Sequence, residues 1–277
     1  MEEFPIKDFF TNENRDKYLN DGYFVVDNII DELICDKINS YVQSNKDNNV
    51  DQTKEIDRDY PFSDIPGTKV FINTIDESSK DNPFNLIDYE KITKMASFLS
   101  NKPMKFWLKK VYLKSAFQGD NEVYHQDYEY HISKGGNTDP FYDYIQCFIA
   151  LEDHSIQGGC LNIIKGSHKS KRIPHDMVMT RNGISKLTVK PDILKQLSKG
   201  NNFKPMELKK GSCVFFSYVT LHGSSSNSSP LDQTRMVIQF MNKDKSHDED
   251  KTQEFFSNRK LKEIKILELM LNHLKQE

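Results

Sequence analysis

The stretch Tyr124-His125-Gln126-Asp127 decides how this 277-residue chain is interpreted, because it places an imidazole and a carboxylate two residues apart. On a β-strand, residues i and i+2 point to the same face, so His125 and Asp127 are expected to lie side by side and to chelate one metal ion. One more histidine from a distant strand would complete the 2-His-1-carboxylate set of non-heme Fe(II) oxygenases. The pair is weak evidence by itself, since His247-Asp248-Glu249 repeats the pattern in a charged run typical of a solvated loop.

The composition indicates a globular protein with a sizeable core, because 36% of the residues are hydrophobic and 11% are aromatic. The net charge is −3, and no long basic block is present. This argues against nucleic acid or an anionic membrane surface as the main partner, and leaves small-molecule chemistry open.

Cysteine usage and the N-terminus indicate a soluble, cytoplasmic protein. The four cysteines (Cys35, Cys147, Cys160 and Cys213) are scattered without Cys-x-x-Cys spacing, so we expect buried free thiols. The start, Met1-Glu2-Glu3-Phe4, lacks the basic and apolar regions of a signal peptide, and no stretch of about 18 apolar residues could span a bilayer.

The order of apolar patterns predicts one domain over 1–277, with a helical part over about 8–100, a β-rich core over about 105–241 and a C-terminal helix over about 254–275. Helices are expected over 8–20, after an Asp31 cap, over 88–99 and over 191–199. Strands are expected over 23–26, 69–72, 106–113, 144–151, 206–208, 213–221 and 234–241, and another starts in the segment 158–164 and ends at 166–168. Many short strands separated by Gly and Pro turns favour a mainly β double-stranded β-helix, a cupin-like jelly roll with flanking helices.

Three finer expectations accompany this pattern. In the helix after Asp31, Leu33, Ile34, Ile38, Tyr41 and Val42 should form one apolar stripe. Asn45–Arg58 is interpreted as a loop, and Pro174–Lys190 as irregular.

Two residues near the end of the β-rich core extend the metal hypothesis. His222 closes the apolar run 213–221, and a lone histidine in such a place is usually structural. Arg235 lies in the following apolar strand, where it either faces solvent on an edge or faces inward. An inward guanidinium is suited to holding a carboxylate in bidentate fashion, and a 2-oxo acid would supply one.

In this order, the motifs resemble the phytanoyl-CoA dioxygenase family of Fe(II)/2-oxoglutarate oxygenases. The resemblance runs from about residue 14 to residue 241. It is carried by Gly22-Tyr23-Phe24-Val25-Val26, Tyr124-His125-Gln126-Asp127, Phe148–Asp153, Gly159–Lys169, His222-Gly223-Ser224, Asn227 and Arg235.

The resemblance implies a fold, an activity and a set of site residues. His125, Asp127 and His222 would bind Fe(II), Arg235 would pair with the distal carboxylate of 2-oxoglutarate, and Ser224 would assist it. With O2 as the second cosubstrate, the reaction would release succinate and CO2 and oxidise a C–H bond of the substrate. Retention of Asp127 favours hydroxylation over halogenation, while desaturation or cyclisation would need the same ligands.

Other positions are carried over more loosely. Phe148 would pack beside the cosubstrate or serve as an ordinary core aromatic. His168 matches a loop position that is not a ligand and should be structural. Lys165 stands where the family commonly has a proline, which makes it a substrate contact or a surface lysine.

The substrate residues are expected in the segments 45–64 and 128–144, which read as lids between strands. Tyr128, Tyr130, His131 and Arg58 in these segments suit a small amphipathic acid, such as an amino-acid derivative, unless the tyrosines only pack. Three alternatives stay open: a catalytically inactive jelly-roll protein that binds a metal or ligand, a protein hydroxylase, and a cupin that uses its metal without 2-oxoglutarate. The sequence predicts no oligomeric state.

Overall fold

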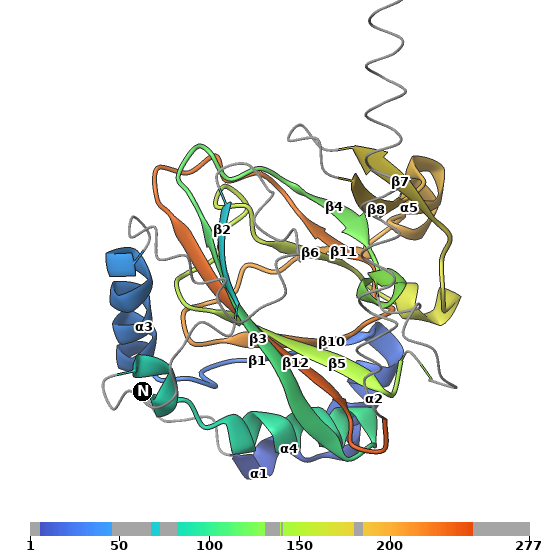
Figure 1. The fold of residues 1–277 in the computed structure, drawn as a ribbon. Coiled ribbons are helices and arrows are strands. Elements are labelled where there is room, and N and C mark those ends of the chain that lie inside the picture. Colours follow the sequence, from blue (N-terminus) through green and yellow to red (C-terminus); the bar gives the residue numbers. More distant parts are fainter. Residues whose placement is uncertain are drawn as a thin grey trace, which may run out of the picture.

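The structure is a computed structural model, and it describes residues 6–45, 68–72, 82–130, 139, 141–179 and 185–245. Its strands are β1 (Tyr23–Val26), β2 (Thr68–Ile72), β3 (Met104–Lys114), β4 (Glu122–His125), β5 (Tyr144–Ala150), β6 (Leu161–Ile164), β7 (His175–Met179), β8 (Ser185–Val189), β9 (Phe203–Pro205), β10 (Cys213–Ser217), β11 (His222–Ser224) and β12 (Gln233–Asn242). They form a six-stranded sheet in the order β1-β10-β5-β12-β3-β2, a four-stranded sheet in the order β4-β11-β6-β9 and a ribbon of β7 and β8 (Figure 1). All of their pairings are antiparallel, as the predicted mainly β jelly roll requires.

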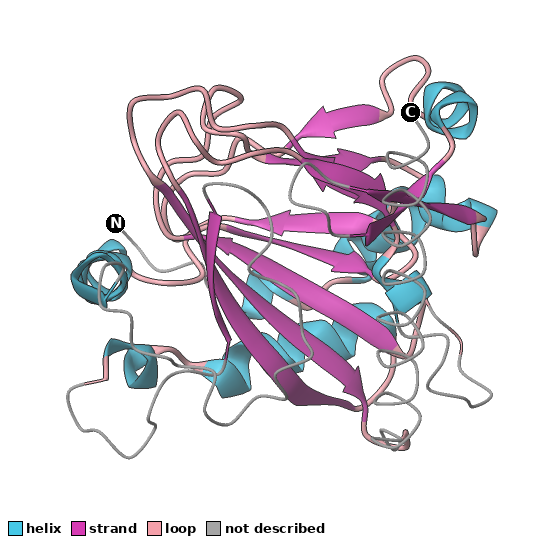
Figure 2. Cartoon of the chain, turned by 45° about the horizontal axis from the view of Figure 1, so that its top comes forward, coloured by secondary structure: helices cyan, strands magenta, loops and turns pink. Residues whose placement is uncertain are grey.

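Helices lie mainly against the face of the six-stranded sheet that points away from the smaller sheet, as Figure 2 shows. The α-helices are α1 (Ile6–Phe9), α2 (Asn12–Asp21), α3 (Glu32–Asn45), α4 (Tyr89–Ser100) and α5 (Pro191–Leu197), and short 3-10 helices are η1 (Pro83–Leu86), η2 (Asp127–Tyr130) and η4 (Ser167–Ser170). Helix α4 begins where predicted, because the Asp88 carboxylate accepts a hydrogen bond from Lys91 N at 2.8 Å.

Alternation along the strands separates two apolar layers. On β12, Met236, Ile238 and Phe240 pack with the helices, whereas Val237 packs between the sheets with Phe148. Arg235 and Gln239 share the face of Val237, because they lie two residues from it on the same strand. The inner face of the large sheet therefore carries polar groups among its apolar ones.

Several local predictions are wrong for identifiable reasons. The segment Pro174–Lys190 is not irregular but contains the β7–β8 ribbon, whose pairing is not visible in its mixed polar sequence. Strand 206–208 is absent, because β9 ends at Pro205. The run 213–221 breaks after Ser217, where Thr220 N donates to Ser217 O at 3.0 Å and the chain passes from one sheet to the other.

The N-terminal helices also differ in detail. The helix predicted over 8–20 is divided into α1 and α2, because the Thr11 side chain caps α2 by accepting from Asn14 N at 3.2 Å. Asp31 accepts from Leu33 N at 2.7 Å next to α3, but Leu33 is 71% exposed and does not belong to the predicted stripe. Cys35 is buried in that helix instead.

The remaining predictions have mixed outcomes. The four cysteines are buried and free, as expected. Within the described ranges, no helix has the length and apolar character needed to cross a bilayer. The loop predicted over Asn45–Arg58, beyond its first residue, and the helix predicted over 254–275 lie outside the described residues, and the single domain over 1–277 stays a prediction.

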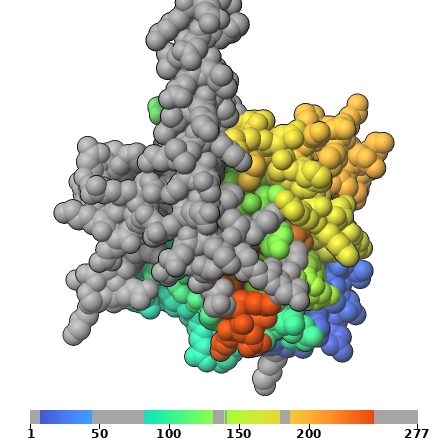
Figure 3. Space-filling model, turned by 45° about the vertical axis from the view of Figure 1, so that its right-hand side comes forward, coloured from blue at the N-terminus to red at the C-terminus, as the bar shows by residue number. Residues whose placement is uncertain are grey.

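On the face seen in Figure 3, the end of β12 (red) lies beside the start of β3, where Lys243 N donates to Pro103 O at 2.7 Å.

Candidate metal centre

His125 and His222 face each other across two neighbouring strands. His125 ends β4, His222 begins β11, and the two residues are direct register partners. Their ring centroids are 4.5 Å apart, and both side chains are buried. His222 therefore opens a strand of the small sheet and does not close the preceding strand, as the apolar run 213–221 would suggest.

Both imidazoles are held by the same kind of hydrogen bond. Nδ1 of His125 lies 2.7 Å from Val123 O, and Nδ1 of His222 lies 2.9 Å from Thr220 O. A carbonyl oxygen only accepts, so Nδ1 carries the proton in each ring and Nε2 of the neutral imidazole presents its lone pair. This is the arrangement that orients histidine ligands in metal sites.

Asp127 reaches the two rings from a turn and not from the strand. Because β4 ends at His125, Asp127 is the first residue of η2, which corrects the expectation that alternation along one strand aligns it with His125. Its Oδ1 lies 3.4 Å from Nε2 of His125, and its Oδ2 lies 3.6 Å from Nε2 of His222.

The turn that carries Asp127 is fastened by the residue between the two ligand candidates. The fully buried Gln126 side chain donates to Lys171 O at 2.8 Å and to Val219 O at 2.6 Å, and accepts from Ile173 N at 2.8 Å. These three hydrogen bonds use the Gln126 side chain entirely for holding the backbone from which Asp127 projects.

These three side chains fit a metal ion. One ligand atom from each of His125, Asp127 and His222 lies within 4.8 Å of the other two. Burial lowers the pKa of His222 to about 4, so its ring stays neutral at pH 7. At His125, burial also lowers the pKa, but the hydrogen bond and charge of Asp127 outweigh it and raise the pKa overall. Two imidazole nitrogens and one carboxylate on one side of an ion are the ligand set of non-heme Fe(II) oxygenases.

Arg235 faces the space between the sheets. Strand β12 lies between β5 and β3, which excludes the edge-strand alternative. The guanidinium carbon lies 5.7 Å from the ring centroids of both Tyr112 and Phe148, and Nη1 donates to Gly159 O at 3.3 Å. Burial lowers the pKa of Arg235, because the charged form is removed from water.

A second buried basic residue, Lys114, lies close to Arg235 and was missed by the sequence analysis. Its side chain is fully buried, its Nζ lies 3.1 Å from Ser224 Oγ, and it also donates to Ser225 O. Burial first, and then repulsion by Arg235, lowers the pKa of Lys114 to about 6. The available signal was the same as for Arg235, namely a basic residue in a strand that is otherwise rich in apolar residues.

Arg235 and Lys114 together fit an anionic ligand. Among the described residues, no carboxylate forms an ion pair with either side chain. A buried guanidinium without an ion-pair partner is costly; a bound carboxylate would offset that cost and would favour the protonated form of Lys114. Ser224, predicted to assist Arg235, lies beside Lys114, and Phe148 lies against the guanidinium, while packing of Phe148 beside the cosubstrate stays a prediction.

The predicted substrate residues are dispersed. Tyr130 lies with its ring edge-on to His125 at 5.7 Å, while its hydroxyl accepts from Leu187 N at 3.1 Å. Tyr128 packs near Tyr144 and Tyr218. His131 and Arg58 lie outside the described residues.

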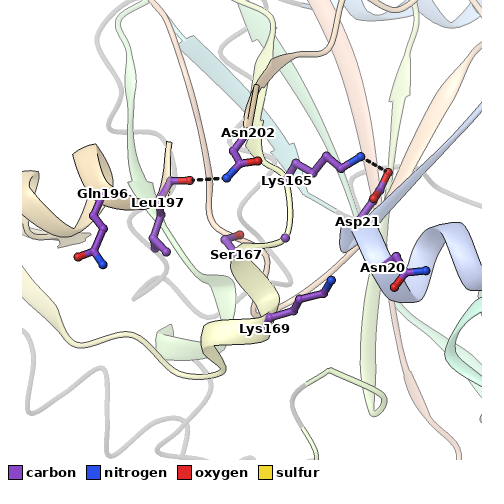
Figure 4. A pocket seen from close by; sticks show the side chains of 9 residues that line it. Asn20, Asp21, Lys165, Ser167, Lys169, Gln196, Leu197 and Asn202 are labelled. Carbon is purple, nitrogen blue, oxygen red and sulfur yellow. Dashed lines mark hydrogen bonds and ion pairs between the residues drawn. The ribbon is translucent and has the colours of Figure 1, made fainter. Parts of the chain in front are cut away.

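Lys165 and His168 lie near the turn between α2 and β1. The Lys165 ammonium is 2.9 Å from Asp21, and both line a cavity of about 400 Å³ whose lining includes none of the three metal-ligand candidates (Figure 4). His168 stacks on Phe141 with ring centroids 4.9 Å apart, and its Nε2 lies 2.9 Å from Leu19 O, which is a structural placement.

Comparison with known proteins agrees with this site. The family described as phytanoyl-CoA dioxygenase (PhyH) matches residues 18–237, so the chain belongs to that family of Fe(II)/2-oxoglutarate-dependent dioxygenases. The family implies iron as cofactor and 2-oxoglutarate as cosubstrate, and the set His125, Asp127 and His222 fits such an ion.

Individual relatives are more distant. Ectoine dioxygenase from Bordetella parapertussis is 29% identical over 133 residues, which is 46% of this chain and 42% of that protein, so the match spans less than half of the relative. The structure of EctD from S. alaskensis with 2-oxoglutarate and 5-hydroxyectoine is 16% identical, with a TM-score of 0.60 over 84% of this chain and 76% of that one. EvdO2 from Micromonospora carbonacea var. aurantiaca, complexed with 2-oxoglutarate, is 17% identical, with a TM-score of 0.60 over 84% and 91% of the two chains. Both structures have the same fold as this protein.

Proposed function

We propose that this protein oxidises a C–H bond of a small carboxylate-bearing or amino-acid-like metabolite, with release of succinate and CO2. Hydroxylation is the simplest outcome, and desaturation or cyclisation would use the same groups. One observation carries the proposal: a three-residue metal-ligand set with two buried histidines lies in the same interior as a buried guanidinium, Arg235, with which no described carboxylate forms an ion pair.

His125, Asp127 and His222 hold the iron in this proposal. When bound, the iron with 2-oxoglutarate and O2 supplies the oxidising power for C–H cleavage. The protein's part is to orient the ligands: the two Nδ1–H bonds to backbone carbonyls fix the imidazole rings, and the Gln146 amide, which donates to Asp127 Oδ2, holds the carboxylate.

Arg235 binds the distal carboxylate of 2-oxoglutarate through its planar fork, and Lys114 and Ser224 complete the pocket for that group. Phe148 forms an apolar wall beside the guanidinium and keeps water from the ion pair. Because the pair forms in a buried place, its attraction is screened less than it would be at the surface.

The proposal of a small-molecule substrate rests on burial and on the names of relatives. The ligand histidines are each only 7% exposed, which favours a compact substrate over a protein side chain. The curated relatives are ectoine dioxygenases, and one structural neighbour was crystallised with 5-hydroxyectoine. These names refer to small molecules.

The test is an anaerobic titration of Fe(II) and 2-oxoglutarate into the purified protein, following the weak visible absorption band of the iron chelate. Asp127→Ala should abolish the band, and Arg235→Ala should require much more 2-oxoglutarate. Lys209→Ala is the matched control, because its side chain is 81% exposed and pairs with the surface residue Asp153, and it should leave the titration unchanged.

The two unfavourable outcomes point to different alternatives. A wild-type protein that binds neither iron nor 2-oxoglutarate would be the inactive jelly-roll protein. Iron binding that is indifferent to 2-oxoglutarate and to Arg235→Ala would indicate a cupin with another cosubstrate.

A further inference from the structure

Two buried glutamines form a chain of hydrogen bonds that starts at Asp127. Gln146 of β5 and Gln239 of β12 are register partners on the inner face of the large sheet, and both are buried. Gln146 Nε2 donates to Asp127 Oδ2, and Gln239 Nε2 donates to Gln146 Oε1 at 3.4 Å.

Asp127 fixes the direction of this chain. An ionised carboxylate only accepts, so Gln146 must turn its NH2 group toward Asp127 and its carbonyl toward Gln239. Gln239 must then offer its own NH2 group to that carbonyl. Its remaining oxygen, Oε1, is buried and has no hydrogen-bond partner. Such an unmatched acceptor is costly, and in a native protein it calls for an explanation.

Lys110 of β3 shares the inner face of the large sheet with Gln239. It is the register partner of Val237, two residues from Gln239 on β12, and it shares the inner face with Tyr112 and Lys114 by alternation. Its side chain is 5% exposed, and the Asp127 carboxylate is close enough to act on its ammonium. Lys110 thus adds a positive charge to the part of the interior where the Gln239 oxygen is unmatched.

Gln239 lies away from the proposed cosubstrate pocket. It is four residues from Arg235 along β12, which is about 13 Å at about 3.3 Å per residue. Lys110 lies opposite Val237, at a level between Arg235 and Gln239, and Asp127 is joined to the Gln239 level through Gln146. A cosubstrate anchored at Arg235 leaves the Gln239 side of Lys110 for the substrate.

We propose that Lys110 and Gln239 form the substrate-recognition subsite, in which the Lys110 ammonium binds a substrate carboxylate and Gln239 Oε1 accepts a hydrogen bond from a substrate N–H or O–H. The substrate class is therefore small amino or hydroxy acids with the carboxylate free. Gln146 is a positioning residue, since it orients Gln239 and Asp127 together. This assignment rests on the proposed function, because it uses iron and 2-oxoglutarate to define where the substrate lies.

The experiment measures succinate release by the protein loaded with Fe(II) and 2-oxoglutarate. The probes are the twenty amino acids and small 2-hydroxy acids, each compared with its methyl ester. We expect at least one free acid to stimulate succinate release and its ester to be weaker by about tenfold to 150-fold, the loss expected for one charged hydrogen bond.

Variants assign this selectivity to the two side chains. Lys110→Met should raise the KM of the acid by a similar factor and leave that of the ester unchanged, while Lys110→Arg should restore much of the difference. Gln239→Leu should raise the KM of the donor-bearing acid and leave the affinity for 2-oxoglutarate, measured by the anaerobic titration, unchanged. Lys109→Met is the matched control, because Lys109 is the next residue of β3, equally buried, and lies over the Tyr89 ring at 5.3 Å on the helical side.

The iron–2-oxoglutarate absorption band separates the possible failures. A wild type without the band would reject the proposed function. A wild type that has the band but is stimulated by no free acid would reject the subsite alone, and so would a Lys110→Met variant that has the band and affects acid and ester equally. If either variant lacks the band because it does not fold, Lys110→Gln and Gln239→Met provide the same comparison.

Discussion

Replacing Arg235 by methionine separates a ligand-binding role from a structural one. The guanidinium is buried, and no described carboxylate pairs with it. If 2-oxoglutarate supplies that carboxylate, Arg235→Met leaves one charge of a buried pair uncompensated, which costs about 3–5 kcal/mol. The expected result is an affinity for 2-oxoglutarate that is weaker by about two to four orders of magnitude.

The same substitution should hardly change the stability of the protein without 2-oxoglutarate. Methionine loses the hydrogen bond to Gly159 O, worth about 0.5–1.5 kcal/mol, and the contacts of the cation with the Tyr112 and Phe148 rings. It also removes a buried cation whose lowered pKa shows that burial disfavours the charge. Because these effects oppose each other, we expect the free energy of unfolding to change by no more than about 1 kcal/mol.

The assay is a pair of measurements on each variant: urea unfolding without ligands, and anaerobic titration with 2-oxoglutarate in the presence of Fe(II). Arg235→Lys is the informative companion, because it keeps the charge and loses the fork; we expect it to weaken binding by about 1.5–3 kcal/mol. A methionine variant destabilised by about 3 kcal/mol or more with unchanged affinity for 2-oxoglutarate would refute the reasoning and make Arg235 a structural residue.

Three further outcomes follow from the geometry. Lys114→Met should remove a pH dependence of stability, because between about pH 6 and the usual lysine pKa of 10.5 the unfolded chain binds a proton that the folded chain does not. The free energy of unfolding of the wild type should therefore rise by about 1.4 kcal/mol per pH unit relative to the variant. Urea unfolding of both proteins at pH 7 and pH 9 measures this, and equal slopes would contradict it. Gly22→Ala should destabilise the protein by at least about 1–2 kcal/mol, since φ is +82° and a Cβ would lie 2.2 Å from Nδ1 of His168. An unchanged midpoint of thermal unfolding would disprove the close approach. Fe(II) should stabilise the wild type by about 2.7 kcal/mol at a concentration 100 times its Kd, and His222→Ala should abolish this increase. Anaerobic thermal unfolding with and without Fe(II) measures it, and an increase that the variant retains would exclude His222 as a ligand.

The fold class and the identity of the ligand candidates could be predicted because their signals are local. Short apolar strands between turn residues indicate a jelly roll, and the His125–Asp127 spacing marks a metal-ligand pair without knowledge of the partner strand. The capped helix after Asp88 was equally predictable, since capping depends on residues within one turn.

Several local details were decided against the sequence pattern. Asp127 was expected to align with His125 on a strand, but it projects from a 3-10 turn that Gln126 fastens to Val219 O and Lys171 O. The apolar run 213–221 reads as one strand, yet the turn at Ser217 divides it between two sheets. Both outcomes depend on partners far away in the sequence.

The sequence alone therefore determined the fold class, because strand and turn patterns are local, and it indicated the family and the residue types proposed for the metal centre through the order of its motifs. Only the tertiary structure placed Lys114 close to Arg235, Gln239 beside Gln146, and Lys110 on the same face of the sheet. Strand register decides which side chains share the interior, and register is set by pairing between segments as distant in the sequence as β1 and β10. A lysine or glutamine in a strand has no local feature that tells which face it will occupy, so the proposed binding pockets became visible only once the two sheets were assembled.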